Sequence, residues 1–274
     1  MRSNISFCSI RSRRIWSPLK FISFIVLYIF ITLFIWKHID IKHPLPENNS
    51  EDSFDSELVR KVMNKIDSAK RDFLSDNITD GFNLALFDSL SDKEKNKYVS
   101  NLISVKRRLK DVRQPECKAQ NFTESTLPTV SIVVIFCNEH LSFILRTIWS
   151  ILSHTPRRLL HEIILVDDAS NTTEIKVVLP WYLKTRFQNE NIRLVRNSVQ
   201  MHLIGSKNIG AKQAVGETLI FLEGHMEVTP GWIEPMLQHI SLNKKSVSLP
   251  MLDFIDYKTL DFNERVNKIL VFVL

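Results

Sequence analysis

The chain has 274 residues and a formal net charge of +6; 44% of its residues are hydrophobic and 24% are charged. This composition is typical of a globular protein with one or two domains, and it excludes a disordered or collagen-like chain. Residues 1–20 contain five basic and no acidic residues, which leaves the rest of the chain with only +1. A nucleic-acid-binding domain needs basic residues in its folded part, so nucleic acid is excluded as a partner.

An apolar segment, residues 21–36, lies between Lys20 and Lys37. As a helix it would span ~24 Å at ~1.5 Å per residue, which is slightly short for a bilayer core, although snorkelling lysines extend its reach. A buried core helix and a cleaved signal peptide are the alternatives, but no small-residue cleavage site follows. We expect an uncleaved transmembrane anchor, with residues 1–20 as a cytoplasmic tail and everything after the anchor in a lumen.

Residues 37–126 are predicted to form a lumenal stem. Pro, Asn and Ser residues over 37–53 indicate a linker, and apolar residues at about every fourth position over 54–74 predict a helix. We interpret the basic run at 106–110 as a solvated face. The part of the chain expected in the lumen contains four candidate N-glycosylation sequons: Asn48, Asn77, Asn121 and Asn171.

Beyond the stem, short β-branched apolar runs alternate with segments of helical length. The runs occupy residues 131–137, 162–168, 192–197, 218–225 and 246–252. The helical segments between them are 141–153, 174–187, 206–215 and 232–242. This alternation predicts an α/β fold whose mostly parallel sheet is covered on both faces.

Ligands of such sheets bind beyond the carboxyl ends of the strands, so the residues after each run are candidates for a site. Asn138 and Glu139 follow the first run, and Asp167 and Asp168 end the second. A carboxylate at Asp168 could accept hydrogen bonds from a ribose or a base. It could equally cap a helix, and the pattern does not decide between these roles.

Glu223, Gly224 and His225 end the fourth run. Strand alternation places Glu223 and His225 on one face, where a carboxylate and an imidazole offer half of a divalent-cation site that phosphate oxygens would complete. Gly224 would let the backbone approach a diphosphate. The alternative is a surface turn with incidental charge.

These strand ends, in this order, resemble those of the polypeptide N-acetylgalactosaminyltransferases, Golgi enzymes that begin mucin-type O-glycosylation. The similarity runs from about residue 82 to 262 and is densest in LPTVSIVVIFCNE at 127–139 and LLHEIILVDDAS at 159–170. It implies a GT-A, Rossmann-like, nucleotide-sugar-binding half domain over 127–262, located in the Golgi lumen of a single-pass type II membrane protein. It also implies a UDP-GalNAc donor, a Mn²⁺ cofactor and transfer to Ser or Thr of polypeptides with retention.

The resemblance also implies roles for individual residues on the nucleoside side of the site. Asp168 matches the aspartate that contacts the uridine, and Ile135 and Phe136 match the wall of the uracil pocket. Gln200 stands near the donor, where the family usually has an arginine. No catalytic residue is assigned.

On the metal side, Glu223 and His225 match an Asp-x-His pair that holds Mn²⁺ and the diphosphate. Gly224 matches the small residue that lies against the donor. Glu223 is one methylene longer than the usual aspartate, so the ion is expected to sit differently, and Gly205 replaces a second arginine.

The family's acceptor-binding half and lectin domain are expected after the donor half, but here residues 263–274 form an apolar tail. Two hypotheses follow. The first is a GalNAc transferase that modifies Ser or Thr of proteins. The second is a truncated, inactive pseudoenzyme that acts as a binding protein.

Overall fold

The structure, a computed structural model, describes residues 56–69, 83–256 and 259–263. The predicted cytoplasmic tail and anchor lie outside these ranges, as do Asn48, Asn77 and nearly all of the predicted apolar tail. None of the helices within these ranges is long and apolar enough to span a bilayer.

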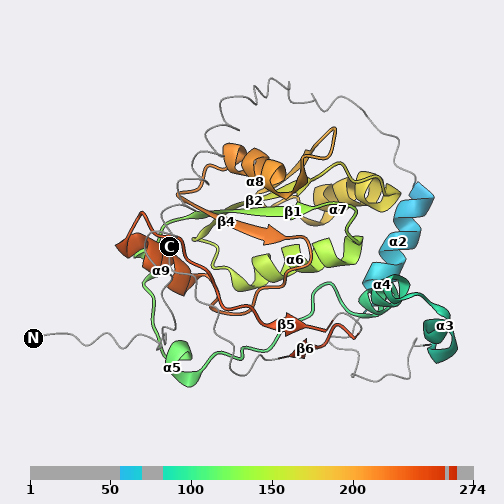
Figure 1. Cartoon of the computed structure of the whole chain (residues 1–274), viewed down its shortest axis with the longest axis horizontal. Coiled ribbons are helices and arrows are strands. Elements are labelled where there is room, and N and C mark those ends of the chain that lie inside the picture. The colour runs from blue at the N-terminus through green and yellow to red at the C-terminus, as the bar shows by residue number, and fades with distance from the viewer. Residues whose placement is uncertain (1–55, 70–82, 257–258, 264–274) are drawn as a thin grey trace, which may run out of the picture. The chain divides into compact units, whose positions relative to one another are not determined.

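Four parallel strands form the central sheet in the order β3–β2–β1–β4 (Figure 1). They are β1 (Val130–Phe136), β2 (Leu160–Asp167), β3 (Ile192–Arg196) and β4 (Thr218–Glu223). Every residue of β1 is buried, as expected for a parallel strand with helices on both faces. The predicted α/β fold with a parallel sheet is confirmed.

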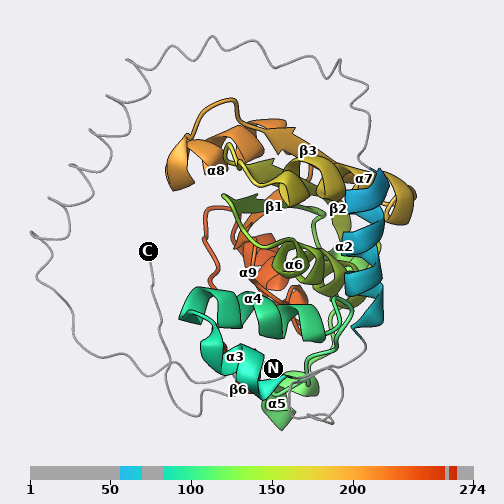
Figure 2. The same ribbon diagram turned by 90° about the vertical axis from the view of Figure 1, so that its right-hand side faces the viewer.

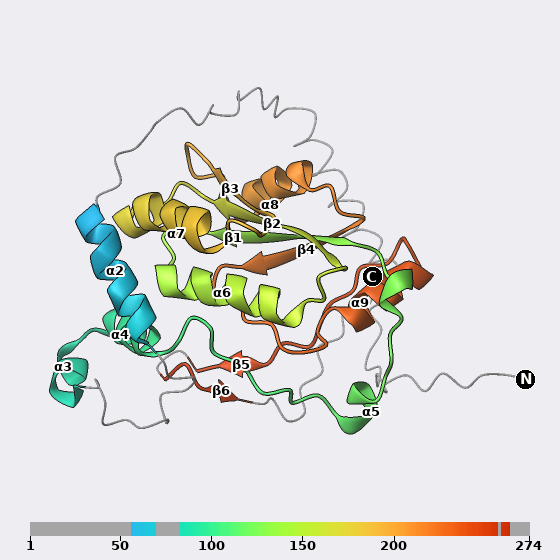
Figure 3. The ribbon, with the colours of Figure 1, turned by 180° about the vertical axis from the view of Figure 1, so that it is seen from behind.

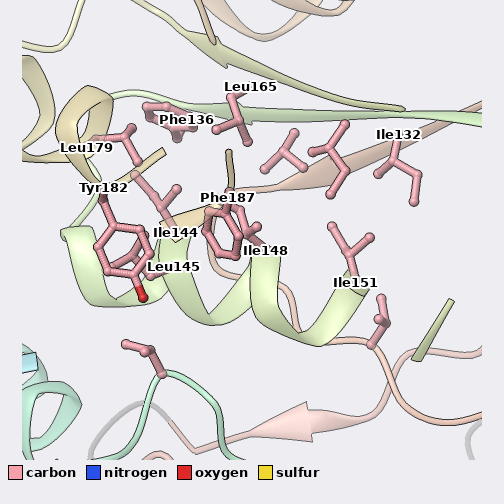
Figure 4. Packing of buried hydrophobic residues seen from close by; sticks show 14 of the residues in the cluster. Ile132, Phe136, Ile144, Leu145, Ile148, Ile151, Leu165, Leu179, Tyr182 and Phe187 are labelled. Atoms are coloured by element: carbon pink, nitrogen blue, oxygen red, sulfur yellow. The ribbon is translucent and has the colours of Figure 1, made fainter. Parts of the chain in front are cut away.

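One face of the sheet is covered by α6 (Leu141–His154) and α7 (Leu179–Arg186). Apolar side chains recur along α6 at every third or fourth position and point toward the strands (Figure 4). The side chains that meet across this interface include Ile144, Ile148 and Ile151 of α6 with Ile132, Phe136 and Leu165 of the sheet. This interface is the centre of the hydrophobic core.

The opposite face is covered by α8 (His202–Gln213), which Figure 2 shows across the strands from α6. The helix lies very close to the sheet at Gly210, where an added Cβ would be 2.3 Å from Val133 Cγ1. Gly210 is therefore required by the packing of α8 against β1.

Segments before β1 pack on the same folded body. The helix predicted over 54–74 is present as α2 (Ser56–Ser68), and its Val59, Met63 and Ile66 join the core beneath the sheet. After α4 (Asp92–Leu102) the chain passes below α6, beside the hairpin of β5 (Phe254–Ile255) and β6 (Phe262–Asn263) (Figure 3). The remaining elements are α3 (Leu84–Ser89), α5 (Pro115–Lys118), η1 (Glu124–Thr126), η2 (Glu174–Val178) and α9 (Glu234–Leu242).

One sequence-based interpretation is wrong, and a second holds except at one residue. Residues 246–252 form no strand, and Val247, Leu249 and Met251 are 58–65% exposed. Their apolar residues alternate with serine as in a strand, but in the described part of the chain no neighbouring strand pairs with them. In the basic run at 106–110, Lys106, Arg108 and Lys110 are exposed, as a solvated face requires, but Arg107 is only 3% exposed.

Candidate functional site

Polar side chains gather at the carboxyl edge of the sheet. The strand register places Phe136 beside Asp167 and Ile135 beside Glu223. The ends of β2, β1 and β4 therefore lie next to one another, and the predicted nucleoside and metal residues follow strands on either side of β1.

Asp168 is buried at the end of β2, with 4% of its surface exposed. Its carboxylate accepts hydrogen bonds from Met201 N at 2.7 Å, His202 N at 2.9 Å and Asn197 Nδ2 at 2.8 Å. Burial acts to raise the pKa of Asp168, but these hydrogen bonds, together with one from Ser206, outweigh it and keep the pKa below its usual value.

A carboxylate has about four acceptor positions, and the chain itself uses most of those of Asp168. Asp168 caps the start of α8 rather than that of the helix that follows β2 directly. Its contact with a uridine stays a prediction.

Asp167 and Asn138 hold the loops around Asp168 in place. Asp167, fully buried, pairs with Arg196 Nε at 2.7 Å and accepts a hydrogen bond from Ser170 N at 2.9 Å. Asn138 N donates to Ser170 Oγ at 2.7 Å, and Asn171 N donates to Asn138 Oδ1 at 2.8 Å. These contacts connect the loop after β1 with the loop after β2.

His225 lies between two carboxylates at the end of β4. Its Nε2 is 3.2 Å from Glu223 Oε2, and its Nδ1 is 2.9 Å from Glu139 Oε2. The His225 and Glu223 side chains are about half exposed. The hydrogen bond to Glu139 and the charges of Glu139 and Glu223 raise the pKa of His225 against the effect of burial. Burial acts to raise the pKa of Glu139, but the interaction with His225 prevails and lowers it.

The donor atoms of Glu223 and His225 fit one divalent cation. Neighbouring ligands of an octahedral ion with bonds of ~2.1 Å lie about 3 Å apart, close to the 3.2 Å between Glu223 Oε2 and His225 Nε2. Imidazole and carboxylate are both suitable ligands for Mn²⁺. Glu139 holds Nδ1 of His225, the arrangement by which a second carboxylate fixes the orientation of a metal-binding histidine.

Within the described residues there is no group of three or more His, Cys, Asp or Glu side chains that could hold a metal ion by itself. A cation at Glu223 and His225 would therefore take its remaining ligands from a bound molecule or from water.

Gly224 packs the turn after β4 against β1. An added Cβ would lie 2.8 Å from Phe136 Cβ. Gly224 N donates to Ile135 O at 2.9 Å, and Gly224 O accepts a hydrogen bond from Thr147 Oγ1 at 3.0 Å. The glycine is thus required by the close approach of the turn to β1, whatever ligand binds there.

The other residues predicted to contact the UDP-GalNAc donor lie in different surroundings from one another. Ile135 and Phe136 are 7% and 4% exposed and belong to separate core clusters, because successive strand residues point to opposite faces. Gln200 is exposed and its Nε2 donates to Cys137 Sγ at 3.1 Å, beside the end of β1. Their roles in donor binding stay predictions, as does glycosylation of the exposed Asn121 and Asn171.

The comparison with known families fits this geometry. The sequence model of glycosyl transferase family 2 matches residues 131–270, just over half of the chain. The chain belongs to glycosyl transferase family 2. This assignment agrees with a GT-A-like sheet whose strand ends carry the polar residues.

Individual relatives and one crystal structure show which members of family 2 this chain resembles. Polypeptide N-acetylgalactosaminyltransferase 4 of Mus musculus is 41% identical over 167 residues, covering 61% of this chain and 28% of the relative. N-acetylgalactosaminyltransferase 6 of Drosophila melanogaster is 39% identical over 162 residues, covering 59% and 24%. The crystal structure of GalNAc-T7 with UDP, GalNAc and Mn²⁺ matches with a TM-score of 0.58 at 36% identity, covering 61% of this chain and 30% of that one.

The predicted resemblance to the polypeptide N-acetylgalactosaminyltransferases is therefore confirmed. The chain spans less than a third of the length of these relatives.

Sequence reasoning pointed to Glu139 as a strand-end residue but gave it no role. Glu139 and His225 are 86 positions apart, so only the parallel register of β1 and β4 shows that they meet. Residues on α6 that hold the turn after β4, such as Thr147, were missed entirely. The signal that could have found them is a polar residue within the apolar stripe of a helix that covers a sheet.

Proposed function

We propose that this chain binds UDP-GalNAc together with Mn²⁺ and is the donor-binding part of a polypeptide N-acetylgalactosaminyltransferase that modifies Ser or Thr. The observation that carries the proposal is the pairing of Glu223 Oε2 with His225 Nε2 at 3.2 Å, beside the carboxyl end of β1. The 36% identical GalNAc-T7, crystallised with UDP, GalNAc and Mn²⁺, supports this choice of ligand and ion.

The chain's own residues would prepare the site for the donor. With its proton on Nδ1, His225 would donate a hydrogen bond to Glu139, and the lone pair of Nε2 would then be available to a cation. Glu223 adds a negative charge beside it. A bound Mn²⁺ would neutralise the charge that develops on the diphosphate as it leaves the sugar. Gly224 keeps this turn close to β1, so the ligands keep a fixed position relative to the strand ends.

A second candidate function is donor binding without transfer. It is favoured by Gln200, which stands where the resemblance predicts an arginine. Gln200 brings no positive charge to the diphosphate, and its amide donates to Cys137 Sγ. In this case the chain would act as a binding protein.

A transfer assay on the full chain separates the two candidates. The chain would be incubated with radiolabelled UDP-GalNAc, Mn²⁺ and a peptide rich in Ser and Thr, with a chelator as the control. Labelled peptide formed only with Mn²⁺ supports the transferase. Mn²⁺-dependent UDP binding without labelled peptide supports the binding protein, and the absence of any UDP binding contradicts both.

We further propose that the protein is a single-pass type II protein of the Golgi membrane, anchored by residues 21–36. The basic residues of the first 20 positions and the apolar run after them support this orientation. Protease added to sealed microsomes should then remove only the first ~20 residues. Digestion of the region after residue 36 would contradict the topology.

A further inference from the structure

Three buried polar residues of α6 support residues 223–228, the last residue of β4 and the turn after it, which we call the β4 turn. Arg146, Thr147 and Ser150 are at most 4% exposed, on a helix whose buried side chains are mainly apolar. Thr147 Oγ1 donates to Gly224 O at 3.0 Å, and Val228 N donates to Ser150 Oγ at 3.1 Å. Both ends of the β4 turn are thus fixed to α6.

The middle of the β4 turn is fixed through Glu227, which lies two residues after His225. Arg107 donates to both carboxylate oxygens of Glu227, from Nε at 2.7 Å and from Nη2 at 2.6 Å. Such a two-point guanidinium–carboxylate contact fixes direction as well as distance. Arg146 Nε lies 3.3 Å from the same carboxylate, on its Oε1.

Arg107 joins segments that are far apart in the sequence. It comes from the extended stretch between α4 and α5, and its Nη1 also donates to Leu260 O at 2.6 Å. The side chains of Arg107 and Glu227 are 0% and 5% exposed. Arg107 lies before residue 131, where the family 2 match begins, in the segment predicted to be the stem. A residue of the predicted stem therefore helps to hold the β4 turn in place.

We infer that Arg107 is a positioning residue for His225 and acts through Glu227. This inference rests on the proposed function, because it takes His225 to be a metal ligand. Burying an ion pair costs about as much as the attraction between its charges returns, but removing one partner alone leaves the other charge buried, so Arg107→Met is expected to lower stability as well as to loosen Glu227. Without the guanidinium fork, Glu227 keeps only the ion pair with Arg146 Nε at 3.3 Å among the described residues, so the middle of the backbone segment that carries His225 is held less firmly.

The test compares full-length wild type with Arg107→Met and Arg107→Lys. Arg193→Met is the matched control: it breaks a contact of Arg193 Nε with the buried Glu162 at 3.1 Å, near the start of β2 and away from the β4 turn. Mn²⁺ affinity would be measured by electron paramagnetic resonance with saturating UDP, at a temperature where circular dichroism shows each protein folded.

Arg107→Met should weaken Mn²⁺ binding by up to about tenfold, the lower end of the effect of losing a direct partner of a metal ligand, because Arg107 acts through Glu227. Arg107→Lys should recover part of the loss, and Arg193→Met should match the wild type. The affinity for UDP in chelator should be the same in all four proteins. Wild-type Mn²⁺ affinity in a folded Arg107→Met, or an equal loss of UDP affinity in chelator, would overturn the inference.

Hydrogen exchange gives a readout that needs neither metal nor nucleotide. Peptides covering residues 223–228 should exchange faster in Arg107→Met than in Arg193→Met, and Arg107→Lys provides the comparison if the methionine variant does not fold. A wild type without Mn²⁺-dependent UDP binding would defeat the proposed metal site. The positioning role of Arg107 would then be judged by exchange alone, and unchanged exchange at 223–228 would overturn it.

Discussion

Asp168 and His225 follow the strands on either side of β1, and their side chains are held in different ways. Asp168 is 4% exposed and accepts hydrogen bonds from two backbone amides and Asn197. The His225 side chain is 53% exposed and lies between two carboxylates. The Asp168 side of the site is therefore closed by the chain itself, whereas the His225 side is open to a ligand. Substitutions at Asp168 should mainly change stability, and substitutions at His225 should mainly change binding.

Replacing Asp168 should give the largest loss of stability. Asp168→Ala leaves the amides of Met201 and His202 without their acceptor, and we expect the free energy of unfolding to fall by about 2–4 kcal/mol. His225→Ala should change it by less than about 0.5 kcal/mol, because His225 is exposed. Urea denaturation of both variants measures this difference, and equal effects would remove the contrast between the two sides.

Gly224→Ala tests whether the open side nevertheless has a rigid backbone. The added Cβ would be 2.8 Å from Phe136 Cβ, so either β1 or the turn must move. Overpacking of this kind costs about 1–3 kcal/mol. The same urea titration should show a lower midpoint than the wild type. A midpoint equal to that of the wild type would mean that the turn moves to make room for the added Cβ at no cost in stability.

The pH dependence of stability should separate His140 from His225. Burial, followed by the charges of Lys97, Lys65 and Arg146, lowers the pKa of His140 to about 4. Because this folded-state pKa lies below the unfolded value, the stability that neutral His140 contributes is present above about pH 6.5 and is lost as the pH falls toward 4. At pH 5 the loss is about 2 kcal/mol.

The contribution of His225 to stability changes with pH in the opposite direction. Its pKa is raised, so its contribution is present below the unfolded value and is lost as the pH rises through the folded one. His140 is the N-cap of α6, and asparagine keeps a capping side chain there, so unfolding measured between pH 7 and 5 should be less pH-dependent in His140→Asn. The dependence should be steeper in His225→Ala. A wild-type slope in both variants would contradict these assignments.

The sheet and its main helices could be predicted because apolar periodicity is a local property of the sequence. That Glu223 and His225 lie close together was also predictable, since they are only two positions apart, although β4 ends at Glu223 and His225 lies in the turn after it. Glu139 and Arg107 could not be given roles, because their partners lie 86 and 120 positions away and no local pattern records those contacts. Residues 246–252 misled the prediction because composition indicates a strand without showing whether another strand is there to pair with it.

The most direct test of the account is calorimetric titration of the full chain with UDP, in Mn²⁺ and in chelator. Wild type should bind UDP at least about tenfold more tightly with Mn²⁺, a gain of about 1.4 kcal/mol. His225→Ala should lose this gain, whereas His161→Ala, an exposed histidine near the start of β2, should keep it. Equal wild-type affinity for UDP in Mn²⁺ and in chelator would contradict the assignment of Glu223 and His225 as the metal site.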